Sequence, residues 1–227
     1  MKNLQKIGGF AALYLAVAYL TGIVLFLLVL DYPNVVDPVQ KVALLADKQL
    51  IFYTTNLLMY VLFGVFLIFL VLALYARLSA AAPAILWTAT AIGLIWAGAL
   101  IASGMVANAG IAPVVARYGQ DPAQAALAWL AIEAVANGLG GANGEILGGV
   151  LTLLVSWAAW QMNGLPKGLN VLGLLVGVVG IVSTVPALNG LVGVFGLSQL
   201  LWFVWLGIVL LRGTPAPVLR QSPSAAM

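Results

Sequence analysis

The sequence contains no cysteine and no histidine. Without cysteine there is no disulfide, thiolate ligand or thiol nucleophile, and without histidine there is no imidazole metal ligand, histidine-ligated haem or Ser-His-Asp triad. Phosphate-binding loops, dinucleotide fingerprints and the HExxH and GxSxG motifs are missing too. These absences exclude most familiar catalytic sites, and we expect no catalytic residue, no metal and no cofactor.

Charged residues are also scarce. They make up 7% of the 227 residues, whereas 64% are hydrophobic and the mean hydropathy is +1.14. Soluble proteins carry roughly 25% charged residues. This composition predicts an all-α, polytopic membrane helix bundle. The net charge of +3 indicates orientation in the membrane rather than a nucleic-acid partner.

Apolar segments long enough to cross a bilayer recur along the chain, since a crossing needs about 20 helical residues. We expect six of them, at residues 7–30, 50–76, 83–106, 141–161, 168–187 and 191–211. The first resembles a signal peptide but exceeds the roughly 7 to 15 residues of a signal peptide's apolar core, which predicts an uncleaved helix. Residues 1–212 then form one transmembrane domain, and residues 213–227, rich in proline, form a disordered cytoplasmic tail.

Two shorter helices are expected on the outer side, at residues 38–49 and 122–138. Each follows an Asp-Pro pair, Asp37-Pro38 and Asp121-Pro122, which is a helix N-cap followed by proline at the first helical position. Whether residues 122–138 rest on the membrane or re-enter it is open. Residues 107–120 are expected to form an irregular loop.

The basic residues predict the orientation of the bundle. In this topology one side carries Lys2, Lys6, Arg77, Lys167, Arg212 and Arg220, and the other carries Lys41, Lys48 and Arg117. All four aspartates lie with the smaller basic set. The positive-inside rule therefore places both termini in the cytoplasm.

The segment 121–161 holds both glutamates of the chain, Glu133 and Glu145. If it is helical, a stripe of polar and small residues spaced four apart forms from Glu133, Asn137, Gly141, Glu145 and Gly149. Only a fold-back at the glycine-rich stretch 138–144 would bring the two carboxylates together.

Glu145 is expected within the outer third of the bilayer, where an ionisable group is a functional-site hypothesis. There it can exchange a proton or meet a cation. It can equally hold helices together through hydrogen bonds to Asn143, Asn56 or Gln199. Both interpretations stay open.

Other polar and aromatic residues could line a cavity for a small or lipidic ligand, or could satisfy one another as hydrogen bonds between helices. The candidate ligand- or proton-binding residues are Glu145, Glu133, Asn137, Asn143, Asn56, Tyr60, Gln199 and Trp202. Small residues recur at a spacing that allows close helix packing: Gly140, Gly144 and Gly148; Gly173, Gly177 and Gly180; Gly190, Gly193 and Gly196.

Three stretches carry a family resemblance: the opening 6–15 (KIGGFAALYL), the turn 163–173 (NGLPKGLNVLG) and the ending 197–206 (LSQLLWFVWL). They resemble a bacterial family of six-helix membrane proteins known as domain of unknown function 4386. The resemblance implies six helices and a location in the bacterial inner membrane, with no catalytic residues to transfer. The family's last helix often carries an acidic residue where this chain has Ser198 and Gln199.

These observations favour a non-enzymatic integral membrane protein. It would be an accessory subunit of a membrane complex or a binder of a small or lipidic ligand. The alternative is a small proton- or cation-coupled carrier or channel that uses Glu145. The expected partners are membrane lipids, together with a larger membrane complex or further copies of the chain.

Overall fold

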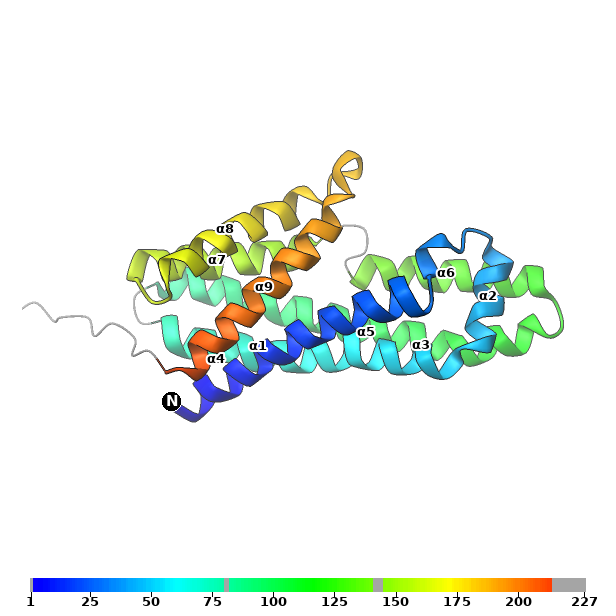
Figure 1. Cartoon of the computed structure of the whole chain (residues 1–227), viewed down its shortest axis with the longest axis horizontal. Helices are drawn as coiled ribbons and strands as arrows, with labels where there is room; N and C mark the ends of the chain where they lie inside the picture. Colours follow the sequence, from blue (N-terminus) through cyan, green and yellow to red (C-terminus); the bar gives the residue numbers. More distant parts are fainter. Residues whose placement is uncertain (1, 80–81, 141–144, 214–227) are drawn as a thin grey trace, which may run out of the picture.

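The computed structural model describes residues 2–79, 82–140 and 145–213, which form an elongated all-α bundle (Figure 1). Within these residues, four helices are long and apolar enough to cross a membrane: Asn3–Val29, Gln49–Leu78, Pro83–Tyr118 and Leu191–Leu211. The chain is therefore a multi-pass integral membrane protein. The tail expected to be disordered lies outside the described residues from residue 214 onward.

The helices follow one another with short connections. In chain order they are α1 (Lys2–Gly22), η1 (Ile23–Val29), η2 (Tyr32–Asn34), α2 (Pro38–Asp47), α3 (Gln49–Asn56), η3 (Leu57–Leu62), α4 (Phe63–Leu78), α5 (Pro83–Tyr118), α6 (Pro122–Gly140), α7 (Ile146–Met162), α8 (Lys167–Val182), η4 (Pro186–Leu188) and α9 (Leu191–Leu211). The segments η1 and η3 are π-helical turns within longer helices, and η2 and η4 are 3-10 turns.

The wide turns of η3 are stabilised by side chains from neighbouring helices. The hydroxyl of Tyr14 donates a hydrogen bond to the carbonyl oxygen of Leu58 at 2.9 Å. The side-chain amide of Asn108 donates to the carbonyl oxygen of Tyr53 at 3.3 Å. Within lipid, polar partners of this kind satisfy backbone groups where the helix geometry changes. Such π-helical segments occur often at functional sites, and η3 carries Met59 and Tyr60.

Helix α5 is longer than the sequence predicts. Its 36 residues span about 54 Å, against about 30 Å for the hydrocarbon core. The irregular loop expected at 107–120 is wrong, because the helix continues through Pro113 to Tyr118. Ile111 and Val114 are buried in this extension, and their packing offsets the hydrogen bond that a proline removes from a helix.

Helices α2 and α6 cover this extension at one end of the bundle (Figure 1). Their predicted N-caps are confirmed: the side chain of Asp37 accepts from the backbone N–H of Gln40 at 2.8 Å, and that of Asp121 from Gln124 at 3.1 Å. The packed side chains form a second apolar cluster, separate from the main core, made of Leu30, Val42, Leu45, Phe52, Ile111, Val114, Ala125, Ala126 and Trp129.

The first turn of α1 lies beside the end of α9, where the amide of Gln5 donates to the carbonyl oxygen of Leu210 at 3.1 Å. The end of α4, the start of α5 and the α7–α8 turn lie at this same end of the bundle, and α2 and the α5–α6 turn lie at the opposite end (Figure 1). Helices α1, α4 and α5 thus alternate in direction along the long axis, α6 and α7 run the same way one after the other, and α8 and α9 alternate again (Figure 1).

Glycines allow α7 and α8 to approach backbone to backbone. A Cβ atom at Gly149 would lie 2.8 Å from both the carbonyl oxygen of Gly177 and the backbone nitrogen of Ile181. The predicted packing role is thus observed at Gly177 and also at Gly180. It is wrong for Gly190 and Gly193, where a Cβ atom would meet nothing within 4 Å. Gly144 lies outside the described residues.

Substitution of Gly149 tests this contact. Gly149→Ala should lower the free energy of unfolding by about 1–3 kcal/mol, the usual cost of overpacking a tight contact. The matched change Gly98→Ala, at a helical glycine whose added Cβ meets nothing within 4 Å, should be neutral or stabilise by about 0.5–1 kcal/mol. Thermal unfolding of both variants in one detergent measures the difference. Equal melting temperatures would contradict the backbone contact.

Candidate functional site

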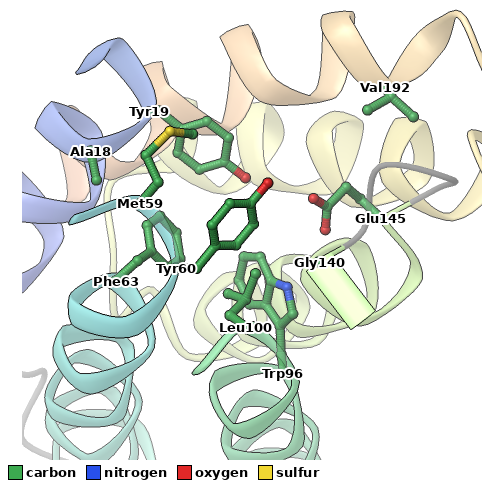
Figure 2. A pocket seen from close by; sticks show the side chains of 10 residues that line it. All are labelled: Ala18, Tyr19, Met59, Tyr60, Phe63, Trp96, Leu100, Gly140, Glu145 and Val192. Carbon is green, nitrogen blue, oxygen red and sulfur yellow. The ribbon is translucent and has the colours of Figure 1, made fainter. Parts of the chain in front are cut away.

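A cavity of about 160 Å³ lies between α1, η3, α4, α5, the end of α6 and the starts of α7 and α9. Its lining residues, shown in Figure 2, are Ala18, Tyr19, Met59, Tyr60, Phe63, Trp96, Leu100, Gly140, Glu145 and Val192. The cavity opens to the surface, because several of these side chains, including Met59 and Val192, stay partly exposed.

Glu145 immediately precedes α7 and points its carboxylate into the cavity (Figure 2). Its backbone N–H donates to the hydroxyl oxygen of Ser183 at 3.2 Å, and that hydroxyl donates to the carbonyl oxygen of Gly180 at 2.6 Å. The residue is only 9% exposed. The end of α8 therefore holds the backbone of Glu145 and leaves its side chain directed at the cavity.

Two tyrosine hydroxyls face this carboxylate (Figure 2). Tyr19 comes from α1 and Tyr60 from η3, so three separate segments supply the polar end of the cavity. Within the part of the chain that the structure describes, neither hydroxyl nor the Glu145 carboxylate has a hydrogen-bond partner. The three groups therefore face the cavity without a partner among the described side chains.

The remaining wall is apolar and largely aromatic. Phe63 contacts two of the other rings: its ring centroid lies 5.5 Å from that of Tyr19 and 5.9 Å from that of Trp96, both in edge-to-face geometry. The space beside these rings depends on small residues, since a Cβ atom at Gly140 would lie 2.9 Å from the Tyr60 ring. The cavity is thus amphipathic, with one polar end and an aromatic body.

A second cavity of about 60 Å³ lies towards the outer helices. The predicted residues Asn56, Glu133 and Asn137 line it, and the ring of Tyr60 lines both cavities. Four further aromatic side chains line this cavity: Phe26, Tyr32, Phe52 and Trp129. Tyr60 therefore separates a space containing Glu133 from a space containing Glu145.

Glu133 is part of a charge pair. Its carboxylate accepts from the ammonium of Lys41 at 3.0 and 3.1 Å, and that ammonium lies 4.8 Å from the ring centroid of Tyr32. The indole N–H of Trp129 donates to the Tyr32 hydroxyl at 2.9 Å. Burial raises the pKa of Tyr32, and the nearby Glu133 carboxylate adds to the rise. These contacts assign Glu133 a structural role between α2 and α6.

Gln199 and Trp202 do not reach the cavity beside Glu145. The hydroxyl of Thr152 donates to the side-chain oxygen of Gln199 at 3.1 Å. Trp202 is buried, with its indole nitrogen close to where a Cβ atom of Gly173 would lie. Both residues belong to the contact between α7, α8 and α9.

The predicted hydrogen bonds of Glu145 to Asn56 and Gln199 are absent among the residues described. The amide of Asn56 donates to Asn108 at 2.9 Å, and Gln199 is engaged with Thr152. Asn143 lies outside the described residues. The carboxylate is therefore directed at a cavity rather than at these two side chains.

The expected helix over 141–161 begins later, because α7 starts at Ile146 and Glu145 itself is not helical. The stripe of residues spaced four apart is thus divided between α6, which carries Glu133 and Asn137, and α7, which carries Gly149. Gly141 lies outside the described residues. The two carboxylates line different cavities, so they form no catalytic pair.

Sequence reasoning missed several lining residues, above all Tyr19, Met59 and Phe63. The π-helical segment η3 would have pointed to Met59, but the sequence does not reveal it. Its wide turns depend on tertiary contacts such as the hydrogen bond from Tyr14 to Leu58. Among the described residues, no group of three or more acidic side chains forms a metal site.

Comparisons with protein-family models, curated proteins and solved structures give no match. The family resemblance drawn from the three short stretches stays a prediction, and the site is interpreted from its own geometry.

Single cysteines test access to the cavity, because the natural chain has no cysteine to react in the background. Met59→Cys should react with the small neutral reagent methyl methanethiosulfonate, since Met59 lines an open cavity. Leu67→Cys, at a position that is 0% exposed in the main core, should react at least about tenfold more slowly because reaction requires local opening. Intact-mass spectrometry follows the rates, and equal rates would refute an open cavity.

Breaking the Lys41–Glu133 pair should destabilise the outer layer. Glu133→Gln leaves a partly buried ammonium without its partner, and we expect a loss of about 1–3 kcal/mol, below the roughly 3–5 kcal/mol of fully buried pairs. The exposed pair Lys48–Asp47, with side chains 45% and 67% exposed, gives the control. Asp47→Asn should change stability by at most about 0.5 kcal/mol. Thermal unfolding that ranks the two variants in the opposite order would contradict the assigned role.

Proposed function

We propose that the protein is a non-enzymatic membrane protein that binds a small amphipathic or lipidic ligand in the cavity beside Glu145. The observation that carries this proposal is the convergence of a buried carboxylate and two tyrosine hydroxyls on the polar end of an aromatic cavity. Ligand sites are typically concave, mostly apolar and supplied with few polar groups that fix orientation. This cavity has each of these properties.

An enzymatic role has less support. Glu145 and the two phenols lie together, but the second carboxylate, Glu133, lines the other cavity and is paired with Lys41. General acid-base catalysis on a bound substrate commonly uses a second acid, base or nucleophile within hydrogen-bond reach of the reacting atoms. The binding role needs no such group.

The carrier or channel is the second candidate, and one observation favours it. Tyr60 lies between the two cavities, and a carboxylate lines each of them. Movement of this ring would join the spaces into one path between Glu145 and the outer helices. Such a carrier would use Glu145 as the coupling group and would act as a homo-oligomer or within a larger membrane complex.

The proposed topology has six crossings, with both termini in the cytoplasm of a bacterial inner membrane. Helices α7 and α8, with 17 and 16 residues, are about 24–26 Å long and need only modest thinning of the bilayer to cross it. The adjacent ends of α1 and α9 support an even number of crossings. The excess of basic residues at that end supports the orientation.

Photolabelling tests ligand binding. An octanol derivative that carries a diazirine should label residues of the cavity wall, with adducts on Glu145 or Tyr60, when the purified chain is irradiated in lipid nanodiscs. Ala18→Leu, which fills space at a lining residue that is 3% exposed, should lower this labelling several-fold because overpacking removes the volume that the probe needs.

Val17→Leu is the matched control, since Val17 lies next to Ala18 on α1 and is 59% exposed. It should leave labelling unchanged. Peptide mass spectrometry quantifies the adducts in both variants. Equal labelling in Ala18→Leu and wild-type protein, or adducts only on lipid-facing residues, would refute binding in the cavity.

A further inference from the structure

The side chains that line the cavity beside Glu145 include one carboxyl group and, among the described residues, no lysine or arginine. Its polar side-chain atoms are a carboxylate, two phenol oxygens and the indole nitrogen of Trp96, and the thioether of Met59 adds a polarisable sulfur (Figure 2). The remaining large side chains are Phe63, Trp96 and Leu100. A positively charged ligand would gain from the carboxylate, from the phenol oxygens and from the faces of the aromatic rings.

The aromatic wall indicates which kind of cation fits the cavity. Four aromatic side chains line the cavity: Tyr19, Tyr60, Phe63 and Trp96. Aromatic faces attract an ammonium group through the ring quadrupole, and several rings around one site are the usual way in which proteins hold ammonium ions with alkyl substituents. A wall of this kind favours an organic cation over a small hydrated one.

A hard metal ion fits the same cavity poorly. Calcium takes 6–8 oxygen ligands, and magnesium requires six in near-ideal octahedral geometry. The only side-chain oxygens among the described residues that line this cavity belong to one carboxylate and two phenols. An alkylated ammonium needs fewer oxygen contacts, because its substituents pack against the rings.

We propose that the ligand of this cavity is an ammonium ion with apolar substituents, held by the Glu145 carboxylate and by the rings of Tyr19, Tyr60, Phe63 and Trp96. This inference rests on the proposed ligand-binding function and names the chemical class of the ligand. The ion can be a free organic cation or the headgroup of a lipid, because both present the same chemistry to the cavity.

Displacement of the diazirine-octanol photolabel tests the charge. The competitors are choline and its neutral isostere 3,3-dimethylbutan-1-ol, which differ in having nitrogen or carbon at the branched centre. In nanodiscs of phosphatidylglycerol, which has no ammonium headgroup, choline should displace the label at concentrations about tenfold lower or more, as expected for a charged ligand among aromatic rings. In Glu145→Gln this advantage should shrink to about threefold or less.

The contribution of the aromatic rings to the preference for choline is tested with variants of Tyr19. Tyr19→Phe keeps the ring and should retain most of the preference for choline, whereas Tyr19→Leu removes the ring and should reduce it several-fold. Thermal unfolding checks that each variant remains folded. If Tyr19→Leu does not fold, the comparison of wild-type protein with Glu145→Gln still decides the role of charge.

A change of the nanodisc lipid from phosphatidylglycerol to phosphatidylcholine identifies the source of the cation. Loss of photolabelling in phosphatidylcholine nanodiscs supports a lipid headgroup as the ligand, and retained labelling that choline displaces supports a free cation. If the neutral isostere displaces the label as well as choline does, the cavity binds ligands but the charge inference is overturned. If the photolabel itself never reaches the cavity, the proposed ligand-binding function fails instead.

Discussion

The contact between α7 and α8 is the constraint on which the candidate site depends. Gly149 lies one turn into α7, against the backbone of Gly177 and Gly180, at a separation that no side chain can enter without moving a helix. The same end of α8 supplies the Ser183 hydroxyl that accepts from the N–H of Glu145. Close packing within lipid depends on such small residues, and here it fixes where α7 begins and where its preceding carboxylate points.

The outer layer gives the site its second boundary. Helix α5 continues well past the length of a bilayer crossing, and α2 and α6 bury the apolar face of its extension. The Lys41–Glu133 pair joins these two outer helices and neutralises the carboxylate of the second cavity. Of the two glutamates in the chain, Glu133 therefore forms a structural ion pair, and Glu145 faces an amphipathic cavity. This division is what makes Glu145 the functional candidate.

Much of the architecture could be predicted from composition and from helix-end chemistry. Long apolar runs predict membrane helices because a crossing requires about 20 such residues, and the Asp-Pro pairs correctly mark the starts of α2 and α6. The end of α5 could not be predicted in the same way. Gly110 and Pro113 indicate a loop locally, but the packing of Ile111 and Val114 against distant segments keeps the chain helical.

The candidate site was only partly predictable for a related reason. Glu145 and Tyr60 are polar residues in apolar segments, so hydropathy alone identifies them. Tyr19 looks like an ordinary residue of the first helix, and only the bundle places its hydroxyl opposite Glu145. Gln199 is just as polar as Asn56, yet it pairs with Thr152 in the core. Depth along a helix can be read from sequence, whereas the direction of a side chain depends on the neighbouring helices.

The central claim is that the Glu145 carboxylate faces the hydroxyls of Tyr19 and Tyr60 inside the bundle. Solid-state NMR of the chain in bilayers, with ¹³C-labelled glutamate and tyrosine, measures this directly, and the glutamate signal lost in Glu145→Gln identifies the carboxyl carbon. The account predicts cross-peaks from that carbon to the ring carbons of both tyrosines. A Glu145 carboxyl signal with contacts to bulk water and none to tyrosine would contradict it.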